Sequence, residues 1–414
     1  MAELFEIKET VERFVLVSVA VSDNDDTKES LDELEELAST AGAITVGKVI
    51  QNRESIHPGT YIGKGKMEEV RLLAEETDAT GVVCDHELSP AQLKNLEDAL
   101  QIKVLDRTVI ILDIFAKRAS TKEGKIQVEL AQLRYRSTRL VGLRNSLSRL
   151  GGGIGTRGPG EKKLEIDRRL IKERITQLRH ELDEIKKNRE TARSLRNKNK
   201  IPVIAIVGYT NAGKSTLLNH LTKAGVLEED KLFATLDPTT RNLVLESGQQ
   251  ILLTDTVGFI RKLPHHLIDS FRSTLEEAKY SDIILHVVDS SNPDLYKQMH
   301  IVYETLNNLG IQDKVIITAF NKQDKLEAEQ ILKDFKADYT VKISAKTGEG
   351  IEALLEQIEK VLNERKILIE RVFSYQEAGK IQTIRKYGQL LEEEFQQDGI
   401  YVKAYVPKEV FQSL

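Results

Sequence analysis

The sequence has almost no cysteine and no long apolar run, and each absence excludes a class of protein. One cysteine among 414 residues rules out an intramolecular disulfide and suits a reducing compartment. No apolar run approaches the roughly 18–20 residues that span a bilayer. The first ten residues, MAELFEIKET, are charged, so we expect no secretion signal. We therefore expect a soluble, cytoplasmic protein without a membrane partner.

Positive charge is concentrated in one segment of the chain. Residues 116–200 contain 24 Lys and Arg against 10 Asp and Glu, a formal charge of +14, although the whole chain carries −5. Such a concentration indicates contact with a polyanion, and a solvated helical surface is the alternative. The length of the chain predicts two to four domains.

The first predicted domain, residues 1–115, alternates strands with helices. This alternation predicts a small α/β domain with a largely parallel sheet. Cys84 is expected to end a buried strand, and a second nucleotide site in the glycine-rich turn at 57–66 stays an open alternative. Strands are predicted at 14–22, 43–50, 81–84 and 102–105, and helices at 30–42, 65–77 and 89–100.

The second predicted domain, residues 116–200, is a basic helical hairpin. Apolar residues recur at heptad spacing over 123–149 and again over 161–195. Two such helices joined by one loop predict an antiparallel pair, and about 30 residues at 1.5 Å each reach roughly 45 Å.

The loop between these helices, GGGIGTRGPG at 151–160, contains the G-x-G-x-x-G pattern of dinucleotide-binding folds. That pattern requires a preceding strand, whereas the segment before this loop is basic and helical. The loop is also longer than a simple hairpin turn. Glycines permit close approach of the backbone to a surface, and Arg157 can pair with phosphate. We therefore predict a tip that contacts RNA, with a merely flexible turn as the alternative.

The third predicted domain, residues 201–365, opens with a strand, a glycine-rich loop and a helix. The loop GYTNAGKS at 208–215 matches G-x-x-x-x-G-K-[ST] in the required context. Backbone N–H groups and the helix N-terminus can cradle phosphate oxygens. Lys214 is expected to reach the β- and γ-phosphates, and the Ser215 hydroxyl to ligate Mg²⁺.

Three further motifs follow in order and complete a nucleotide site. In DTVG (255–258), Asp255 is expected to hold Mg²⁺ through water, and the N–H of Gly258 to bond the γ-phosphate. In NKQD (321–324), Asp324 can accept two hydrogen bonds from guanine, which adenine cannot donate. The backbone of SAK (344–346) is expected to meet the guanine carbonyl. The ordered set predicts a GTPase rather than an ATP-binding domain of the same class.

The switch threonine has three candidates in LFATLDPTTR, residues 232–241: Thr235, Thr239 and Thr240. One of them should complete the Mg²⁺ shell and sense the γ-phosphate. We prefer Thr235, because FATLDP resembles the FTTLxP switch of the Obg-type ribosome-assembly GTPases.

Two positions bear on the rate of hydrolysis. Ras-like enzymes place a Gln after the DxxG glycine to orient water, and here that position is Phe259. We therefore expect slow intrinsic hydrolysis that a partner accelerates. Asn211 in the P-loop resembles the potassium-activated GTPases, so K⁺ dependence is a further hypothesis; holding the loop through backbone hydrogen bonds is its alternative role.

The segment GGGIGTRGPGEKKLEIDRR (151–169) beside this G domain is similar to the HflX family of ribosome-associated GTPases, in the translation-factor-related class. The resemblance covers nearly the whole chain. It implies ribosome-stimulated hydrolysis, binding to the large ribosomal subunit and its rRNA, and splitting of stalled or hibernating ribosomes under stress, notably heat. It also implies that Arg157 and the backbone of 151–160 contact rRNA. A large-subunit assembly GTPase and a regulatory switch acting through protein partners remain alternatives.

The predicted site residues fall into three groups. Lys214, Thr235 and Gly258 are the predicted catalytic residues, and Ser215, Thr235 and Asp255 the predicted Mg²⁺ ligands. The predicted contacts to GTP or GDP are Gly208, Tyr209, Thr210, Asn211, Ala212, Gly213, Lys214, Ser215, Phe233, Ala234, Thr235, Leu236, Asp237, Asp255, Thr256, Val257, Gly258, Asn321, Lys322, Gln323, Asp324, Ser344, Ala345 and Lys346.

The last predicted domain, residues 366–414, is a small α+β unit without recognisable chemistry. We predict a strand over 367–375, a helix over 376–396 and a strand over 399–407. For the whole chain we expect a monomer that does not bind DNA.

Overall fold

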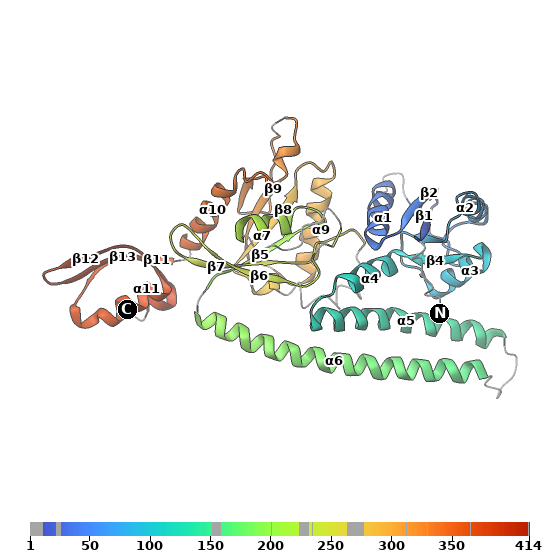
Figure 1. Cartoon of the computed structure of the whole chain (residues 1–414), viewed down its shortest axis with the longest axis horizontal. Coiled ribbons are helices and arrows are strands. Elements are labelled where there is room, and N and C mark those ends of the chain that lie inside the picture. The colour runs from blue at the N-terminus through green and yellow to red at the C-terminus, as the bar shows by residue number, and fades with distance from the viewer. Residues whose placement is uncertain are drawn as a thin grey trace, which may run out of the picture. The chain divides into compact units, whose positions relative to one another are not determined.

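The chain divides into two compact units in a computed structural model (Figure 1). The first unit comprises Met1–Ile185, Asp230–Leu236 and Arg261–Arg272, and the second comprises Lys186–Glu229, Asp237–Ile260 and Ser273–Leu414. Among the residues that the structure describes, no helix is long and apolar enough to cross a membrane. The described residues are 11–21, 26–150, 159–199, 201–222, 232–233, 235–262, 277–311, 313–328, 330–364, 366–412 and 414.

The first unit begins with a four-stranded parallel sheet in the order β2-β1-β3-β4. Its central strand β1 is apolar along nearly its whole length, which is typical of a parallel strand covered on both faces. The parallel α/β fold predicted from the sequence is therefore confirmed, and Cys84 ends β3 fully buried. The elements are β1 (Arg13–Ala20), α1 (Thr27–Ala41), β2 (Ile44–Asn52), α2 (Lys64–Glu76), β3 (Gly81–Cys84), α3 (Pro90–Leu100) and β4 (Lys103–Asp106).

A further helix, α4 (Arg107–Arg118), follows β4 directly, where the sequence analysis assigned no element. Asp106 caps it, because its Oδ1 accepts the backbone N–H of Val109 over 3.2 Å. The same buried carboxylate accepts the Tyr135 hydroxyl at 2.9 Å and the Arg139 guanidinium at 2.6 Å. The Asp106 side chain thus joins the end of the sheet both to α4 and to the segment that carries Tyr135 and Arg139.

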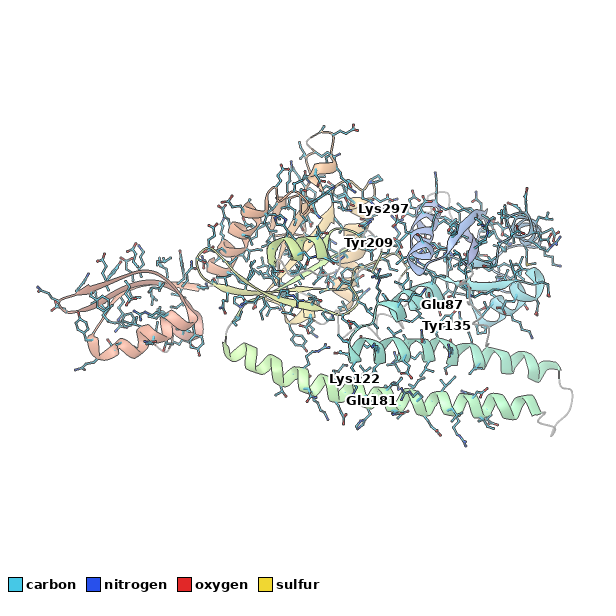
Figure 2. All side chains as sticks on the ribbon, viewed as in Figure 1. Glu87, Lys122, Tyr135, Glu181, Tyr209 and Lys297 are labelled. Carbon is cyan, nitrogen blue, oxygen red and sulfur yellow. The ribbon has the colours of Figure 1, made fainter. Side chains whose placement is uncertain are left out.

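The helical middle region consists of α5 (Lys122–Leu150) and α6 (Pro159–Asn199), as the heptad pattern predicts. Ile126, Leu130 and Leu178 are buried in the seam between the two helices. Glu129 on α5 accepts two hydrogen bonds from Arg174 on α6, at 2.7 and 2.9 Å. Figure 2 labels Lys122 and Tyr135 on α5 and Glu181 on α6. The predicted glycine-rich tip lies outside the described residues from 151 to 158, Arg157 included.

The second unit contains a six-stranded sheet in the order β10-β9-β8-β5-β7-β6, parallel except for its edge strand β6. Because parallel strands end at one edge, the residues after β5, β7 and β9 meet there. The elements are β5 (Val203–Gly208), α7 (Lys214–Thr222), β6 (Thr239–Val244), β7 (Gln250–Asp255), β8 (Ile283–Asp289), α9 (Leu295–Asn308), β9 (Val315–Asn321), η1 (Gln323–Lys325), β10 (Tyr339–Lys342) and α10 (Ile351–Glu364).

The chain ends in a small antiparallel sheet of order β11-β13-β12. The predicted helix over 376–396 is wrong in its second half, because 389–396 is a strand. The helix ends at Gly388, where a Cβ would lie 2.9 Å from the carbonyl oxygen of Ile384 and 2.7 Å from that of Tyr405. The elements are β11 (Lys366–Phe373), η2 (Tyr375–Glu377), α11 (Ala378–Tyr387), β12 (Gln389–Gln396), β13 (Gly399–Pro407) and α12 (Lys408–Phe411).

Candidate nucleotide-binding site

The P-loop turns tightly between β5 and α7 at two glycines in the left-handed region. Gly208 has φ 156°, and a Cβ there would meet the carbonyl oxygen of Val287 at 2.3 Å. Gly213 has φ 93°, and a Cβ there would lie 2.2 Å from Nδ2 of Asn321. Asn211 between them also has a positive φ of 60°. The loop therefore requires glycine at both ends to pass so close to its neighbours.

Lys214 opens α7 with its ammonium group buried against the P-loop. Its Nζ donates to the carbonyl oxygen of Tyr209 over 2.7 Å; Tyr209 is labelled in Figure 2. Burial lowers the pKa of Lys214 to about 8, although the carboxylate of Asp255 opposes that shift. A buried cation beside successive backbone N–H groups is suited to binding phosphate oxygens.

The DTVG motif follows β7 and lies against the P-loop. A Cβ on Gly258 would lie 2.9 Å from Nζ of Lys214, so the backbone of this motif runs beside the predicted phosphate-binding cation. The hydroxyl of Thr256 donates to the carbonyl oxygen of Ile206 on the neighbouring strand over 2.8 Å. This bond fixes the start of the motif to β5, and Val257 is buried next to it.

Phe259 is hydrogen-bonded to the P-loop through its backbone. Its N–H donates to the carbonyl oxygen of Gly208 at 3.1 Å, and its own carbonyl accepts the N–H of Thr210 at 2.8 Å. The ring is buried. A buried aromatic ring cannot orient a water molecule as a glutamine does.

Ser215 and Asp255 are the two predicted Mg²⁺ ligands of the second unit, and they lie together. The Ser215 hydroxyl donates to Oδ2 of Asp255 over 3.0 Å. Hydroxyl and carboxylate oxygens are the donors that Mg²⁺ prefers, and Asp255 is fully buried at the end of β7. The donor set that these two residues bring together therefore fits a magnesium ion.

Asn321 joins the P-loop to the loops that the sequence predicts to bind guanine. Its Nδ2 donates to the carbonyl oxygen of Ala212 over 2.8 Å, and its Oδ1 accepts the N–H of Ala345 over 2.8 Å. The side chain is 2% exposed, so both bonds form away from solvent. The predicted site residues at the ends of β5 and β9 and after β10 thus form one connected network.

Asp324 is held in position by the SAK motif. The hydroxyl of Ser344 donates to its Oδ1 over 2.6 Å and itself accepts the N–H of Thr347 at 3.2 Å. Oriented in this way, a carboxylate can accept the paired donors on one edge of guanine. Lys346, the last residue of the motif, is exposed.

Two polar residues that the sequence analysis missed support the NKQD motif from the end of β8. Lys322, with a left-handed φ of 63°, forms an ion pair with Asp289 at 2.8 Å. Gln323 donates its amide to the Ser290 hydroxyl over 2.8 Å. Asp289 and Ser290 follow the apolar run IILHVV, and polar residues at the end of a buried parallel strand are the signal that predicts such a role.

The switch candidates before Asp237 belong to the first unit. Phe233 has a left-handed φ of 55° and packs edge-to-face on Phe115 of α4, with ring centroids 4.6 Å apart. Leu236 is buried as well, Thr235 is partly buried, and Ala234 lies outside the described residues. The role of Thr235 as Mg²⁺ ligand stays a prediction, as does the preference for it over Thr239 and Thr240.

The segment after Phe259 also contributes to the first unit. Lys262, with a left-handed φ of 52°, donates to Oδ2 of Asp85 over 2.5 Å. Asp85 is fully buried and also pairs with Arg107 at 2.7 Å. Burial alone would raise the pKa of Asp85, but the charges of Arg107 and Lys262 outweigh it and lower the pKa to about 2.

Comparison with known proteins finds GTP-binding GTPase families along the chain and relatives that match it over its full length. Three family models match: "GTP-binding GTPase N-terminal" at residues 28–116, "GTP-binding GTPase Middle Region" at 118–196 and "50S ribosome-binding GTPase" at 203–322. GTPase HflX of Lacrimispora saccharolytica is 69% identical over 100% of this chain and 98% of its own length. GTPase HflX of Caldanaerobacter subterraneus subsp. tengcongensis is 50% identical over 99% of this chain and 94% of its own length. GTPase HflX of Escherichia coli is 42% identical over 86% of this chain and 84% of its own length.

Proposed function

The chain belongs to the HflX family of GTPases, and we propose that it binds the large ribosomal subunit and splits stalled or hibernating ribosomes under stress such as heat. The observation that carries the proposal is the combination, in one chain, of the GTPase site with a helical hairpin region of formal charge +14. A regulatory switch that contacts only proteins has no need of that charge. The match of residues 203–322 to a 50S ribosome-binding GTPase family supports the same partner.

Nucleotide binding uses the network described above. Backbone N–H groups of 208–215 and the ammonium group of Lys214 hold the phosphates, and Asp324 selects guanine. Ser215 and Asp255 would hold Mg²⁺, and Thr235 is the proposed third ligand. When bound, Mg²⁺ neutralises charge that develops on the phosphate oxygens. The backbone N–H of Gly258 bonds the γ-phosphate, so this loop distinguishes GTP from GDP.

Hydrolysis is slow until a partner completes the site. Phe259 cannot orient the attacking water, because its side chain is buried and carries no hydrogen-bonding group. Contact with the ribosome is proposed to order the switch segments around GTP. Asn211, at the exposed turn of the P-loop, is the residue through which K⁺ would assist.

RNA binding is assigned to the basic hairpin region and its tip. Arginine pairs with phosphate through a planar fork of donors, and glycines let the backbone approach a surface closely. Arg157 and the backbone of 151–160 are therefore the proposed contacts to rRNA. Since bound GTP orders the switches, the GTP form is proposed to bind and split the ribosome, and hydrolysis to permit release.

The test is a sedimentation assay of 70S ribosomes with the full chain and a non-hydrolysable GTP analogue. We expect conversion of 70S particles into subunits, and loss of that conversion with Arg157→Glu although GTP binding is unchanged. A wild-type protein that binds subunits but leaves 70S particles intact would contradict splitting and favour an assembly factor. Precursor large subunits should then accumulate in cells that lack the protein.

A further inference from the structure

One face of the C-terminal sheet is packed and the other carries a regular array of acidic and aromatic side chains. Ile369, Phe373 and Val402 point toward α11 and α12 and form the core of this domain. The register of the strands defines rows of residues across the opposite face, and two of these rows contain its exposed glutamates. The rows are Glu370–Lys403–Glu392 and Val372–Tyr401–Glu394, and we call these six residues the acidic sheet face.

The acidic sheet face carries a net negative charge that its own lysine does not neutralise. The face holds three glutamates, all exposed, and one lysine, Lys403, whose Nζ lies 3.9 Å from Oε2 of Glu370. The Tyr401 hydroxyl donates to Oε1 of Glu370 over 2.8 Å. That hydrogen bond, a little burial and the charges of Glu370, Glu392 and Glu394 raise the pKa of Tyr401 to about 12. All three glutamates thus act on the Tyr401 hydroxyl.

The face also presents apolar and aromatic surface beside the charge. Val372 is 43% exposed, and the ring of Tyr401 is partly exposed in the same row. Glutamates on the edge strand β12 can be explained as protection against edge-to-edge aggregation. That explanation does not account for a valine and a tyrosine next to them, because protection requires only charge. Tyrosine with aliphatic surface inside a charged rim is instead typical of protein interfaces.

The sign of the charge decides which class of macromolecule the face can meet. Phosphate groups of RNA are repelled by three carboxylates, whereas Lys and Arg side chains of a protein are attracted to them and stack on tyrosine. We propose that the acidic sheet face docks on a basic protein surface of the large ribosomal subunit. The inference rests on the proposed function, and it gives the C-terminal domain a protein partner while the basic hairpin region takes the RNA.

The first experiment compares two full-length variants of equal net charge. Glu392→Gln with Glu394→Gln removes two negative charges from the face, and the control Gln382→Lys with Thr383→Lys adds two positive charges on α11. Affinity for purified large subunits is measured by cosedimentation with a non-hydrolysable GTP analogue. We expect the first variant to bind roughly tenfold more weakly and the control to bind no more weakly than wild type. Tighter binding of the first variant would show that the face meets rRNA. Unchanged binding would show that the face contacts nothing on the subunit. Each of these two results overturns the inference.

The second experiment identifies the partner directly. A cysteine-directed photocrosslinker is attached at Glu392→Cys, with Gln382→Cys on α11 as control; the native Cys84 is fully buried and should not react. We expect the first position to crosslink to a ribosomal protein and the control not to. Crosslinks to rRNA, to a second copy of this chain or to nothing overturn the inference. If wild-type protein does not sediment with large subunits at all, the proposed function itself fails. Binding without the predicted crosslink removes only the inference.

Discussion

The side-chain amide of Asn321 donates to the carbonyl oxygen of Ala212 in the P-loop over 2.8 Å. The same side chain accepts the N–H of Ala345, which follows β10. The predicted phosphate-binding and guanine-binding parts of the site are therefore joined by one buried residue. A change that displaces Asn321 should weaken both parts together.

Gly213→Ala should abolish nucleotide binding. Its Cβ would lie 2.2 Å from Nδ2 of Asn321, and φ at this residue is 93°, so both the network and the loop must shift. We expect affinity for GTP and GDP to fall by about 100-fold or more, measured by fluorescence with labelled nucleotides. Gly248→Ala is the matched control, since φ there is 79° with nothing within 4 Å. It should cost only about 1 kcal/mol of unfolding free energy and leave affinity intact. Equal loss in both variants would contradict the role given to the Asn321 contact.

Asp324→Asn should change which base is bound. The carboxylate is proposed to accept hydrogen bonds from two donors on guanine, and an amide presents a donor where an acceptor is needed. We expect GTP affinity to fall at least about 100-fold and xanthosine triphosphate, which offers an oxygen at that position, to compete better. Competition binding at fixed Mg²⁺ measures both. Ser344→Ala removes the 2.6 Å bond that orients Asp324, together with the bond that the hydroxyl accepts from Thr347, but leaves the carboxylate in place. A loss of about tenfold without a change of base preference is therefore expected. Unaltered base preference in Asp324→Asn would exclude Asp324 from guanine recognition.

Nucleotide affinity should weaken with rising pH above about 8. The pKa of Lys214 is lowered to about 8 by burial, and bound phosphate must raise it because it favours the ammonium form. Below pH 8 the lysine is already charged and affinity is constant; above pH 8 binding must take up a proton. Each pH unit should then cost up to about tenfold in Kd until the pKa of the complex is reached. Calorimetry in buffers of different ionisation enthalpy measures the proton uptake, and no uptake at pH 9 would show that Lys214 does not bind the phosphates.

Asp106→Ala should destabilise the first unit strongly. The carboxylate accepts hydrogen bonds from Leu88, Val109, Tyr135 and Arg139, and its loss leaves Arg139 without its buried partner. We expect about 3–5 kcal/mol less unfolding free energy, measured with urea. The control Asp113→Ala removes an exposed ion pair to Lys117 and should change the value by about 0.5 kcal/mol or less. Similar values for the two variants would show that Asp106 does not hold α4 and α5 to the sheet.

The sequence predicted those parts of the fold that depend on local patterns. The P-loop, the two heptad helices and the parallel N-terminal sheet each have a characteristic spacing, and the structure contains all three. Residues 389–396 were predicted as helix because QLLEEEF has helix-forming composition, whereas pairing with β13 makes them a strand. Intrinsic propensity is outweighed there by tertiary contacts, which a single sequence does not reveal.

The site was predicted as a set of motifs but not as a network. The type and order of Lys214, Ser215, Asp255 and Asp324 follow from the chemistry of phosphate, Mg²⁺ and guanine. The contacts of Asn321 to Ala212 and Ala345 follow only from how three strand ends meet in space. The roles predicted for residues of the first unit, above all that of Thr235 as a Mg²⁺ ligand, stay predictions.

The central claim is that the GTPase is activated by the large ribosomal subunit through its basic hairpin region. The most direct test is steady-state GTP hydrolysis with and without purified large subunits, for wild type, Arg157→Glu and the control Lys333→Glu, which makes the same charge change at an exposed position of the second unit. We predict strong stimulation of wild type and Lys333→Glu, and loss of stimulation in Arg157→Glu with unchanged basal hydrolysis. Hydrolysis that large subunits do not stimulate in the wild type would contradict the account.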